Sequence, residues 1–251
     1  MRKSKEMRLK ILVVVFWGLI FAGSAAWAEP QHFESAARQT TLIEIFSSEG
    51  CSSCPPAEAW ASALTDAGHL WRDFVPVVFH VDYWDRLGWK DRFSSADFTK
   101  RQGDYVEAWH QSTLYTPGFV LNGRPWRGWR QEKTIPRQDK EPGILRVEEQ
   151  QNGSYKVSFE PVGNFDRGTT HAALLGFGIK VQVTRGENAG RTLRHDFTVL
   201  DFQSAPLQGH PLSTVFKFDA GKFSVTRFGL AVWVTKSGGT RPVQAVGAYL
   251  S

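Results

Sequence analysis

The stretch T-L-I-E-I-F-S-S-E-G-C-S-S-C-P-P, residues 41–56, contains the only two cysteines of this 251-residue chain. Its first seven residues are typical of a β-strand and lead directly into Cys51 and Cys54. Pro55 and Pro56 then begin a helical pattern, because the missing N–H of proline costs nothing in the first turn of a helix. Two residues between cysteines suit a reactive dithiol, half of a metal site or a small structural staple. The surrounding sequence has to decide among these three.

The N-terminus has the three-part layout of a secretory signal peptide. Basic residues precede an apolar run over residues 11–21, and Ala26-Trp27-Ala28 fits an A-x-A cleavage site. The alternative is an uncleaved membrane anchor, but residues 11–26 are fewer than the ~20 that a spanning helix needs. We therefore predict a signal peptide over residues 1–28 and a periplasmic or secreted protein, which meets the membrane only if this segment stays uncleaved.

The charge of the remaining chain excludes one class of partner. Residues 29–251 contain 25 basic and 24 acidic residues, a net charge of +1. Such a balance gives no electrostatic footprint for nucleic acid, so no nucleic-acid partner is expected. Export also implies an oxidising environment, in which two cysteines exist as a dithiol or a disulfide. Since no second Cys or His pair follows at a metal-type spacing, we expect no metal site.

A change of composition divides the chain. Seven of the eight tryptophans after residue 28 lie between Trp60 and Trp129. The following stretch R-Q-E-K-T-I-P-R-Q-D-K-E-P-G, residues 130–143, is rich in charge and proline. We predict a first domain over residues 38–130, a linker over 131–142 and a second domain over 143–251.

The two halves differ in their hydrophobic periodicity. The first half alternates strands and helices: a buried strand over residues 74–84, a helix capped by Ser94 or Ser95, and a hairpin turn at Asn122-Gly123. From Ile144 onward the pattern has period two and about seven strand-like segments. Such a pattern indicates an antiparallel β-sandwich.

Three segments carry a resemblance to a known family. They are E-I-F-S-S-E-G-C-S-S-C-P-P-A-E-A-W (44–60), F-H-V-D-Y-W-D-R-L-G-W-K-D-R-F-S-S (79–95) and Y-T-P-G-F-V-L-N-G-R (115–124). Together they resemble the secreted bacterial domain-of-unknown-function family 1223, which has no assigned substrate, and their order is similar to that of a thioredoxin-like domain. The expected fold class is therefore an α/β thioredoxin-like N-terminal domain followed by an all-β, antiparallel sandwich-like C-terminal domain.

The cysteines carry the functional prediction. Cys51 stands just before a helix, whose dipole and free N–H groups favour the thiolate, so Cys51 is the expected attacking thiol. Cys54 is the expected resolving thiol. An inert staple is the alternative, but a four-residue loop restrains the unfolded chain little. We predict an exported thiol-disulfide oxidoreductase that acts on protein or small-molecule thiols and disulfides, including an exported redox partner, with no cofactor beyond its redox-active disulfide.

The resemblance also implies further site residues. It places Thr116 and Pro117 opposite the dithiol, with a cis bond before Pro117 and the Thr116 backbone available to substrate. It implies a proton-transferring carboxylate on the first strand, where Glu44 stands one residue too far from Cys51 for the family spacing.

The loop that follows the second strand is a candidate groove rim, formed by His80, Asp82 and Trp84. Under the alternative interpretation, this is a salt-bridged loop whose aromatic side chains pack on the second domain.

Two other functions remain open. Two thiolates suit Cu(I), and His80 would complete such a site, which makes a copper-binding or copper-delivery module one alternative. A non-enzymatic partner-binding protein that uses the second domain is the other, because His171, His195 and His210 are scattered there without a metal-ligand spacing.

Overall fold

A nine-stranded sheet runs through both halves of the chain. The structure is a computed structural model that describes residues 31–131 and 134–251, so the predicted signal peptide over residues 1–28 lies outside the described residues. The strand order is β15-β14-β9-β12-β3-β2-β5-β6, with β4 beside β3. The strands are β2 (Thr41–Ser47), β3 (Phe74–Val81), β4 (Ser94–Ser95), β5 (Gly118–Leu121), β6 (Arg124–Pro125), β9 (Gly168–Phe177), β12 (Thr198–Leu207), β14 (Arg227–Lys236) and β15 (Pro242–Tyr249).

This sheet corrects the predicted fold class. The expected α/β thioredoxin-like N-terminal domain followed by an all-β sandwich-like domain is wrong, because the described residues contain fifteen strands and only two α-helices, in a mostly β structure. Strand β12 from the second half pairs in parallel with β3, and the Val78 N–H donates to the Phe197 carbonyl oxygen at 2.9 Å. The edge of β3 is thus occupied by a strand that lies far away in the sequence. Among the described residues, no helix is long and apolar enough to cross a membrane.

The predicted local elements are confirmed. Helix α1 (Pro55–Ala63) begins with its two prolines in the first helical positions. Helix α2 (Ala96–Ala108) is capped by Ser95, whose side chain accepts a hydrogen bond from the Asp97 N–H at 3.2 Å. Asn122 and Gly123 have φ angles of 47° and 76°, as the tight turn between β5 and β6 requires.

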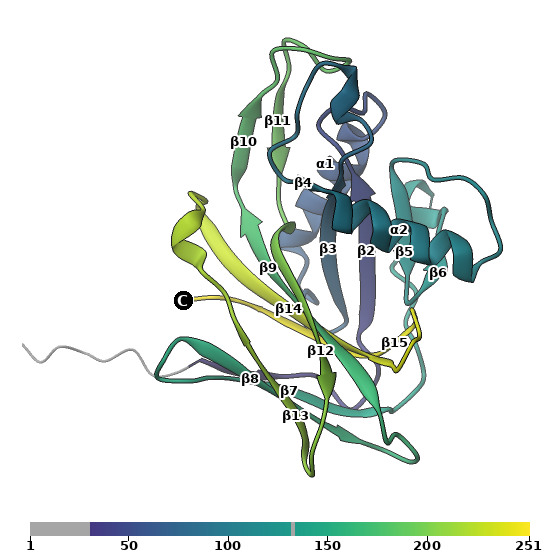
Figure 1. Cartoon of the computed structure of the whole chain (residues 1–251), viewed down its shortest axis with the longest axis vertical. Coiled ribbons are helices and arrows are strands. Elements are labelled where there is room, and N and C mark those ends of the chain that lie inside the picture. Colours follow the sequence, from purple (N-terminus) through teal and green to yellow (C-terminus); the bar gives the residue numbers. More distant parts are fainter. Residues whose placement is uncertain (1–30, 132–133) are drawn as a thin grey trace, which may run out of the picture.

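The two helices cover opposite faces of the sheet. Phe79 of β3 packs against Phe98 of α2, with ring centroids 5.1 Å apart, and Figure 1 shows α2 crossing in front of β2 and β3. On the other face, Trp60 of α1 packs against Phe119 of β5 at 5.5 Å. Because successive side chains of a strand point to opposite faces, His80 points toward α1.

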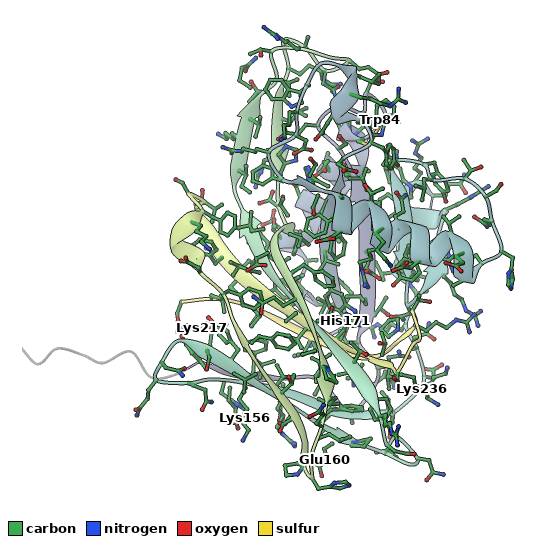
Figure 2. The ribbon with its side chains drawn as sticks, in the orientation of Figure 1. Trp84, Lys156, Glu160, His171, Lys217 and Lys236 are labelled. Carbon is green, nitrogen blue, oxygen red and sulfur yellow. A yellow bond between two sulfur atoms is a disulfide. The ribbon has the colours of Figure 1, made fainter. Side chains whose placement is uncertain are left out.

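A second sheet of four strands packs against the C-terminal part of the large sheet. It has the order β1 (His32–Glu34), β7 (Gly143–Glu149), β8 (Ser154–Pro161) and β13 (Leu212–Lys217). Val157 and Phe159 of β8 face the core between the sheets, together with Leu230 of β14. Lys156 and Glu160 alternate with them and point to solvent (Figure 2).

A two-stranded hairpin links β9 to β12. It consists of β10 (Ile179–Gln182) and β11 (Thr192–His195), and we call residues 179–195 the hairpin arm. Figure 1 shows the hairpin arm rising beside α1, and β11 contacts that helix. The arm therefore brings residues of the second half to the cysteine end of α1.

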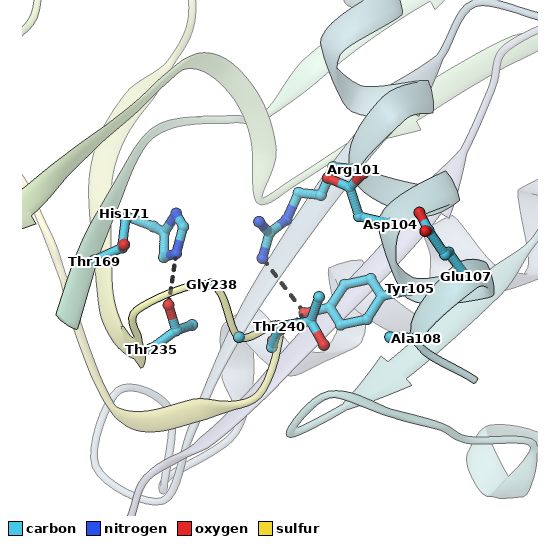
Figure 3. A pocket seen from close by; sticks show the side chains of 11 residues that line it. Arg101, Asp104, Tyr105, Glu107, Ala108, Thr169, His171, Thr235, Gly238 and Thr240 are labelled. Atoms are coloured by element: carbon cyan, nitrogen blue, oxygen red, sulfur yellow. Dashed lines mark hydrogen bonds between the residues drawn. The ribbon is translucent and has the colours of Figure 1, made fainter. Parts of the chain in front are cut away.

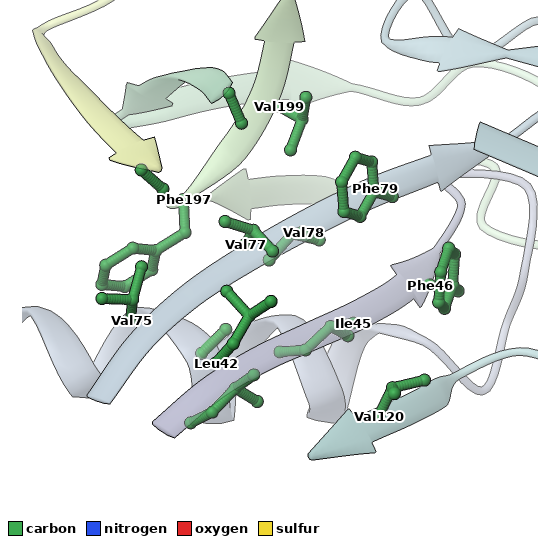
Figure 4. Packing of buried hydrophobic residues seen from close by; sticks show 14 of the residues in the cluster. Leu42, Ile45, Phe46, Val75, Val77, Val78, Phe79, Val120, Phe197 and Val199 are labelled. Atoms are coloured by element: carbon green, nitrogen blue, oxygen red, sulfur yellow. The ribbon is translucent and has the colours of Figure 1, made fainter. Parts of the chain in front are cut away.

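The main core combines residues from both halves. Figure 4 shows Val75, Val77 and Phe79 of β3 beside Phe197 and Val199, which belong to the segment that leads into β12 and to β12 itself. Because neither half buries these side chains alone, the described chain is expected to unfold cooperatively.

Replacing Phe79 by alanine tests this expectation. Phe79 is fully buried, and its ring lies 5.1–5.7 Å from those of Phe46, Phe98 and Phe202. The variant is expected to lose about 3–5 kcal/mol of unfolding free energy, with urea transitions that coincide by tryptophan fluorescence and by circular dichroism.

The matched control is Val215→Ala, because this side chain on β13 is 59% exposed and its loss should cost less than ~0.5 kcal/mol. Two separate transitions would instead support independent domains over residues 38–130 and 143–251.

Candidate functional site

The two cysteines form a buried disulfide where β2 leads into α1. Cys51 is bonded to Cys54, and their Cα atoms are 5.4 Å apart. Cys54 is the N-cap residue of α1. The two residues are 0% and 1% exposed, whereas Ser52 and Ser53 between them are exposed. The disulfide is thus covered by its own loop and by the segments around it.

The tip of the hairpin arm holds this loop from the other half of the chain. The buried Asn188 side chain donates to the carbonyl oxygens of Glu49 at 2.9 Å and Cys51 at 3.0 Å. Next to it, Glu187 accepts a hydrogen bond from the Ser52 N–H at 3.0 Å. These contacts tie the cysteine loop to the hairpin arm.

Thr116 and Pro117 lie on another side of the same loop. The Ser53 hydroxyl is 3.2 Å from the Cys51 sulfur and donates to the Thr116 carbonyl oxygen at 3.3 Å. The Thr116 hydroxyl accepts from the Trp84 indole at 2.8 Å, and Figure 2 labels Trp84 in this region. The cis bond expected between Thr116 and Pro117 is present. Trp84, one of the three residues predicted to form a groove rim, thus lies beside the disulfide loop through its contact with Thr116.

Glu44 and Asp82 have partners on α2. The Glu44 carboxylate accepts from Arg101 at 2.6 Å and from the Tyr105 hydroxyl. Asp82 accepts from the Thr99 hydroxyl at 2.6 Å. Since α2 covers the face opposite to α1, these contacts hold the Glu44 side chain on the α2 face, and its role in proton transfer stays a prediction.

Five ionisable side chains form a buried cluster on the α1 face. His80 Nδ1 is 2.6 Å from Asp91 Oδ2, and its Nε2 is 3.4 Å from Glu58 Oε1. His195 Nδ1 is 3.3 Å from Glu58 Oε2, and its Nε2 is 3.4 Å from Glu49 Oε1. Each of the five is at most 5% exposed. Each residue contacts the next in one continuous series of charged side chains, in the order Asp91, His80, Glu58, His195 and Glu49.

Three elements bring the centre of this cluster together. Glu58 follows Cys54 by one helical turn and is buried with Ala57 and Ala61 on α1. His80 occupies the α1-facing side of β3, and His195 ends β11 of the hairpin arm. The cluster therefore exists only when the second half packs beside α1.

Opposite charges within the cluster shift its pKa values. Burial alone would lower the pKa of His80, but the Asp91 and Glu58 carboxylates outweigh burial and raise this pKa well above its usual value. Burial likewise opposes the charge on His195, yet Glu58 and Glu49 raise its pKa to about 9. Burial would raise the pKa of Glu58, but the two imidazoles hold it far below its usual value. The ionised forms are thus mutually stabilised.

A pocket of about 350 Å³ leads to both the disulfide and the cluster. Cys54, Glu58 and His195 line it together with Arg191 and Arg194. A small molecule in this pocket would therefore lie next to Cys54, Glu58 and His195. The two arginines favour an anionic occupant.

A second pocket opens on the α2 side, between α2 and strands β9 and β14 (Figure 3). It has a volume of about 520 Å³, and Arg101, Tyr105, His171 and Thr235 line it. The His171 ring stacks on Trp233 with centroids 5.4 Å apart. Burial and, second, the positive charge of Arg101 lower the pKa of His171 to about 3.

The low pKa of His171 predicts a pH-dependent contribution to stability. Between pH ~6.5 and ~3 the unfolded chain binds a proton at this position that the folded chain does not, so stability present above ~6.5 is lost as the pH falls. Between pH 7.5 and 4.5, the wild type should lose about 1–2 kcal/mol more unfolding free energy than His171→Gln, measured by urea denaturation. Equal losses would contradict a neutral His171 imidazole in the folded protein.

The site residues predicted from the sequence did not include Glu58, Asp91 or His195. Glu58 had a signal, because it stands one turn after Cys54 on the inward stripe of an alanine-rich helix. Asp91 lies in the loop that was predicted to form a groove rim. For His195 the sequence contains no such signal, since its neighbours in space come from α1 and β3.

Solved structures share the overall fold. A crystal structure of an Agrobacterium tumefaciens protein superposes with a TM-score of 0.61 at 24% sequence identity, covering 84% of this chain and 93% of that one. HBP35 of Porphyromonas gingivalis superposes with a TM-score of 0.57 at 12% identity, covering 86% of this chain and 76% of that one. No curated protein matches the sequence.

A family profile accounts for most of the described chain. It matches residues 42–235, which include the disulfide loop, both helices, the hairpin arm and all five residues of the buried cluster. The family carries the description "protein of unknown function", and the chain belongs to this family, DUF1223.

Proposed function

We propose that this chain is an exported protein that exchanges disulfides with protein or small-molecule thiols through Cys51 and Cys54. The observation that supports this function best is their disulfide at a strand-to-helix turn, beside a pocket that reaches Cys54. A loop of two intervening residues closes too small a ring to stabilise the fold much, so chemistry is the better reason for the bond.

The exchange reaction balances within the dithiol and its substrate. The Cys51 thiolate attacks one sulfur of a substrate disulfide, and the other substrate sulfur leaves as a thiolate that takes up a proton. The Cys54 thiolate then attacks Cys51, restores the Cys51–Cys54 bond and releases the second substrate thiol. Two electrons pass from the dithiol to the substrate, and the reverse sequence oxidises a substrate dithiol.

The surroundings favour Cys51 as the attacking thiol. Its sulfur is 3.2 Å from the Ser53 hydroxyl, which would donate a hydrogen bond to a Cys51 thiolate by rotating its proton away from the Thr116 carbonyl oxygen. The N-terminus of α1 favours negative charge at both cysteines, and Cys54 is its N-cap, so the assignment to Cys51 rests on the Ser53 contact. Thr116 lies against the same loop, because its carbonyl oxygen accepts a hydrogen bond from Ser53, and we expect its backbone to pair with an extended substrate when that bond is released.

Alkylation of the reduced protein tests this assignment. Cys51 should react faster than Cys54, with a thiol pKa below the free value of ~8.5, when rates in Cys54→Ser and Cys51→Ser variants are compared across pH. Faster modification of Cys54 would reverse the roles. Exchange activity retained by Cys51→Ser would support the non-enzymatic, partner-binding alternative.

Because the disulfide is buried, a substrate has to gain access to its sulfur atoms before exchange begins. Because Cys51 and Cys54 are 0% and 1% exposed, a substrate reaches the sulfurs only when the cysteine loop separates from the hairpin arm. Asn188 and Glu187 carry the contacts that have to break.

Substitution of Asn188 tests this access step. Asn188→Ala removes two hydrogen bonds to the carbonyls of Glu49 and Cys51, each with a net contribution of ~0.5–1.5 kcal/mol. Reduction of the disulfide by dithiothreitol should therefore be about tenfold faster, as followed by trapping of free thiols.

Asn152→Ala is the matched control, because Asn152 is exposed and bonds only Ser154 in the turn after β7. An Asn188→Ala rate equal to that of the control would mean that the hairpin arm does not limit access.

A copper-binding or copper-delivery module remains the alternative use of the same cysteines. It needs both thiolates free, together with an imidazole such as that of His80. The His80 ring is engaged by Asp91 and Glu58 in this structure. Measuring copper in the purified, reduced protein separates this alternative from disulfide exchange.

A further inference from the structure

We propose that Glu58, His80 and His195 form a binding site for one divalent transition-metal ion, zinc by preference, on the α1 face next to the disulfide pocket. This site goes beyond disulfide exchange and does not use the cysteines. The three side chains come from α1, β3 and β11, and their ligand atoms all lie within 4.8 Å of one another. It departs from the expectation, drawn from histidine spacing in the sequence, that the chain binds no metal.

The ligand atoms converge on one point without forming hydrogen bonds. Both Glu58 carboxylate oxygens, His80 Nε2 and His195 Nδ1 are buried, and none of them makes a hydrogen bond. The three residues are 5%, 0% and 1% exposed. Buried polar atoms in folded proteins are nearly always hydrogen-bonded. These four atoms meet only across ion-pair distances of 3.3 and 3.4 Å, which an ion bound between them would replace.

The spacing of these atoms requires a small movement before an ion binds. The His80 Nε2–Glu58 Oε1 and His195 Nδ1–Glu58 Oε2 distances are 3.4 and 3.3 Å, longer than ordinary N–H···O bonds. These contacts involve different oxygens of Glu58, and one ligand atom from each residue lies within 4.8 Å of the others. Because ligands bound at ~2.0–2.1 Å to a tetrahedral zinc ion are about 3.3–3.4 Å apart, the side chains have to turn inward to bind it. Zinc is preferred because two histidines and one carboxylate are donors that it takes.

Carboxylates stand behind both imidazoles. Histidines that bind metals usually direct their other nitrogen to a carboxylate. His80 Nδ1 is hydrogen-bonded to Asp91 at 2.6 Å, whereas His195 Nε2 lies at an ion-pair distance of 3.4 Å from Glu49, without a hydrogen bond. Glu49 in turn accepts a hydrogen bond from the Trp89 indole at 2.6 Å. Each ring therefore presents its remaining nitrogen to Glu58.

The position of the cluster leaves a path to the ion. Glu58 and His195 line the 350 Å³ pocket, together with Cys54, Arg191 and Arg194. Three protein ligands leave the fourth tetrahedral position free for water or for a small anion that enters through this pocket. Two histidines and one glutamate are a donor set that open zinc sites use.

Metal binding to the full chain tests the proposal directly. The chain is stripped with a chelator and titrated with Zn²⁺ or Co²⁺ against a chromophoric competitor, and stoichiometry is read by native mass spectrometry. One ion per chain is expected, and Co²⁺ should give the visible absorption of a four-coordinate site without a thiolate charge-transfer band. Absence of stoichiometric binding by the wild-type chain would overturn the proposal.

Variants locate the ion. Glu58→Gln and His195→Ala are expected to weaken Zn²⁺ binding more than ~100-fold, and Asp91→Asn about 10–100-fold as an outer-shell partner. His171→Gln is the matched control, because this histidine lies outside the cluster and should leave the affinity unchanged.

The Cys51→Ser/Cys54→Ser double variant should also bind one ion. Circular dichroism checks that each variant is folded. Loss of binding in the double variant with retention in His195→Ala would move the ion to the cysteines and overturn the assignment. Disulfide exchange is measured separately in the presence of chelator, so the two proposals fail independently.

Discussion

The pairing of β12 with β3 is the constraint on which the rest of the structure depends. Thr198 is aligned with Val78, so the chain that enters β12 passes directly beside the carboxyl-terminal half of β3. His195 precedes that point by three residues and reaches the α1 face, where its ring is 5.0 Å from that of His80. Without this pairing neither the shared core nor the buried cluster would form.

The same pairing explains why the disulfide is enclosed. Because β10 and β11 lead into β12, the hairpin arm is held against α1, and its tip reaches the cysteine loop through Asn188. In the proposed exchange reaction, the arm would have to move before a substrate reached the disulfide. The β12–β3 pairing and the Asn188 hydrogen bonds therefore bear on both the fold and the enclosure of the disulfide.

The buried cluster is costly unless every charge in it has a partner. Removing one member of a buried ion pair typically destabilises a protein by ~3–5 kcal/mol, because the other charge is left uncompensated. Here His80 and His195 each lie between two carboxylates, and Glu58 lies between both rings. Ionisable groups with strongly shifted pKa values that gather beside a pocket are candidates for a functional site. This is why the cluster, rather than the cysteines alone, defines the candidate site.

The sequence by itself determined the local elements of this protein. The Pro55-Pro56 start of α1, the Ser95 cap of α2 and the Asn122-Gly123 turn follow from backbone chemistry within a few residues. The uniformly apolar run of β3 also correctly indicated a strand that is buried on both faces.

Only the tertiary structure decided which strand pairs with β3, and therefore that the two halves share one sheet. Hydrophobic periodicity states which face of a strand is buried, but the backbone groups at its edge are the same for every sequence and do not specify their partner. The meeting of Glu58, His80 and His195 follows from that long-range pairing. Short-range patterns therefore predicted the cysteine loop and its helix, and could not predict the cluster beside them.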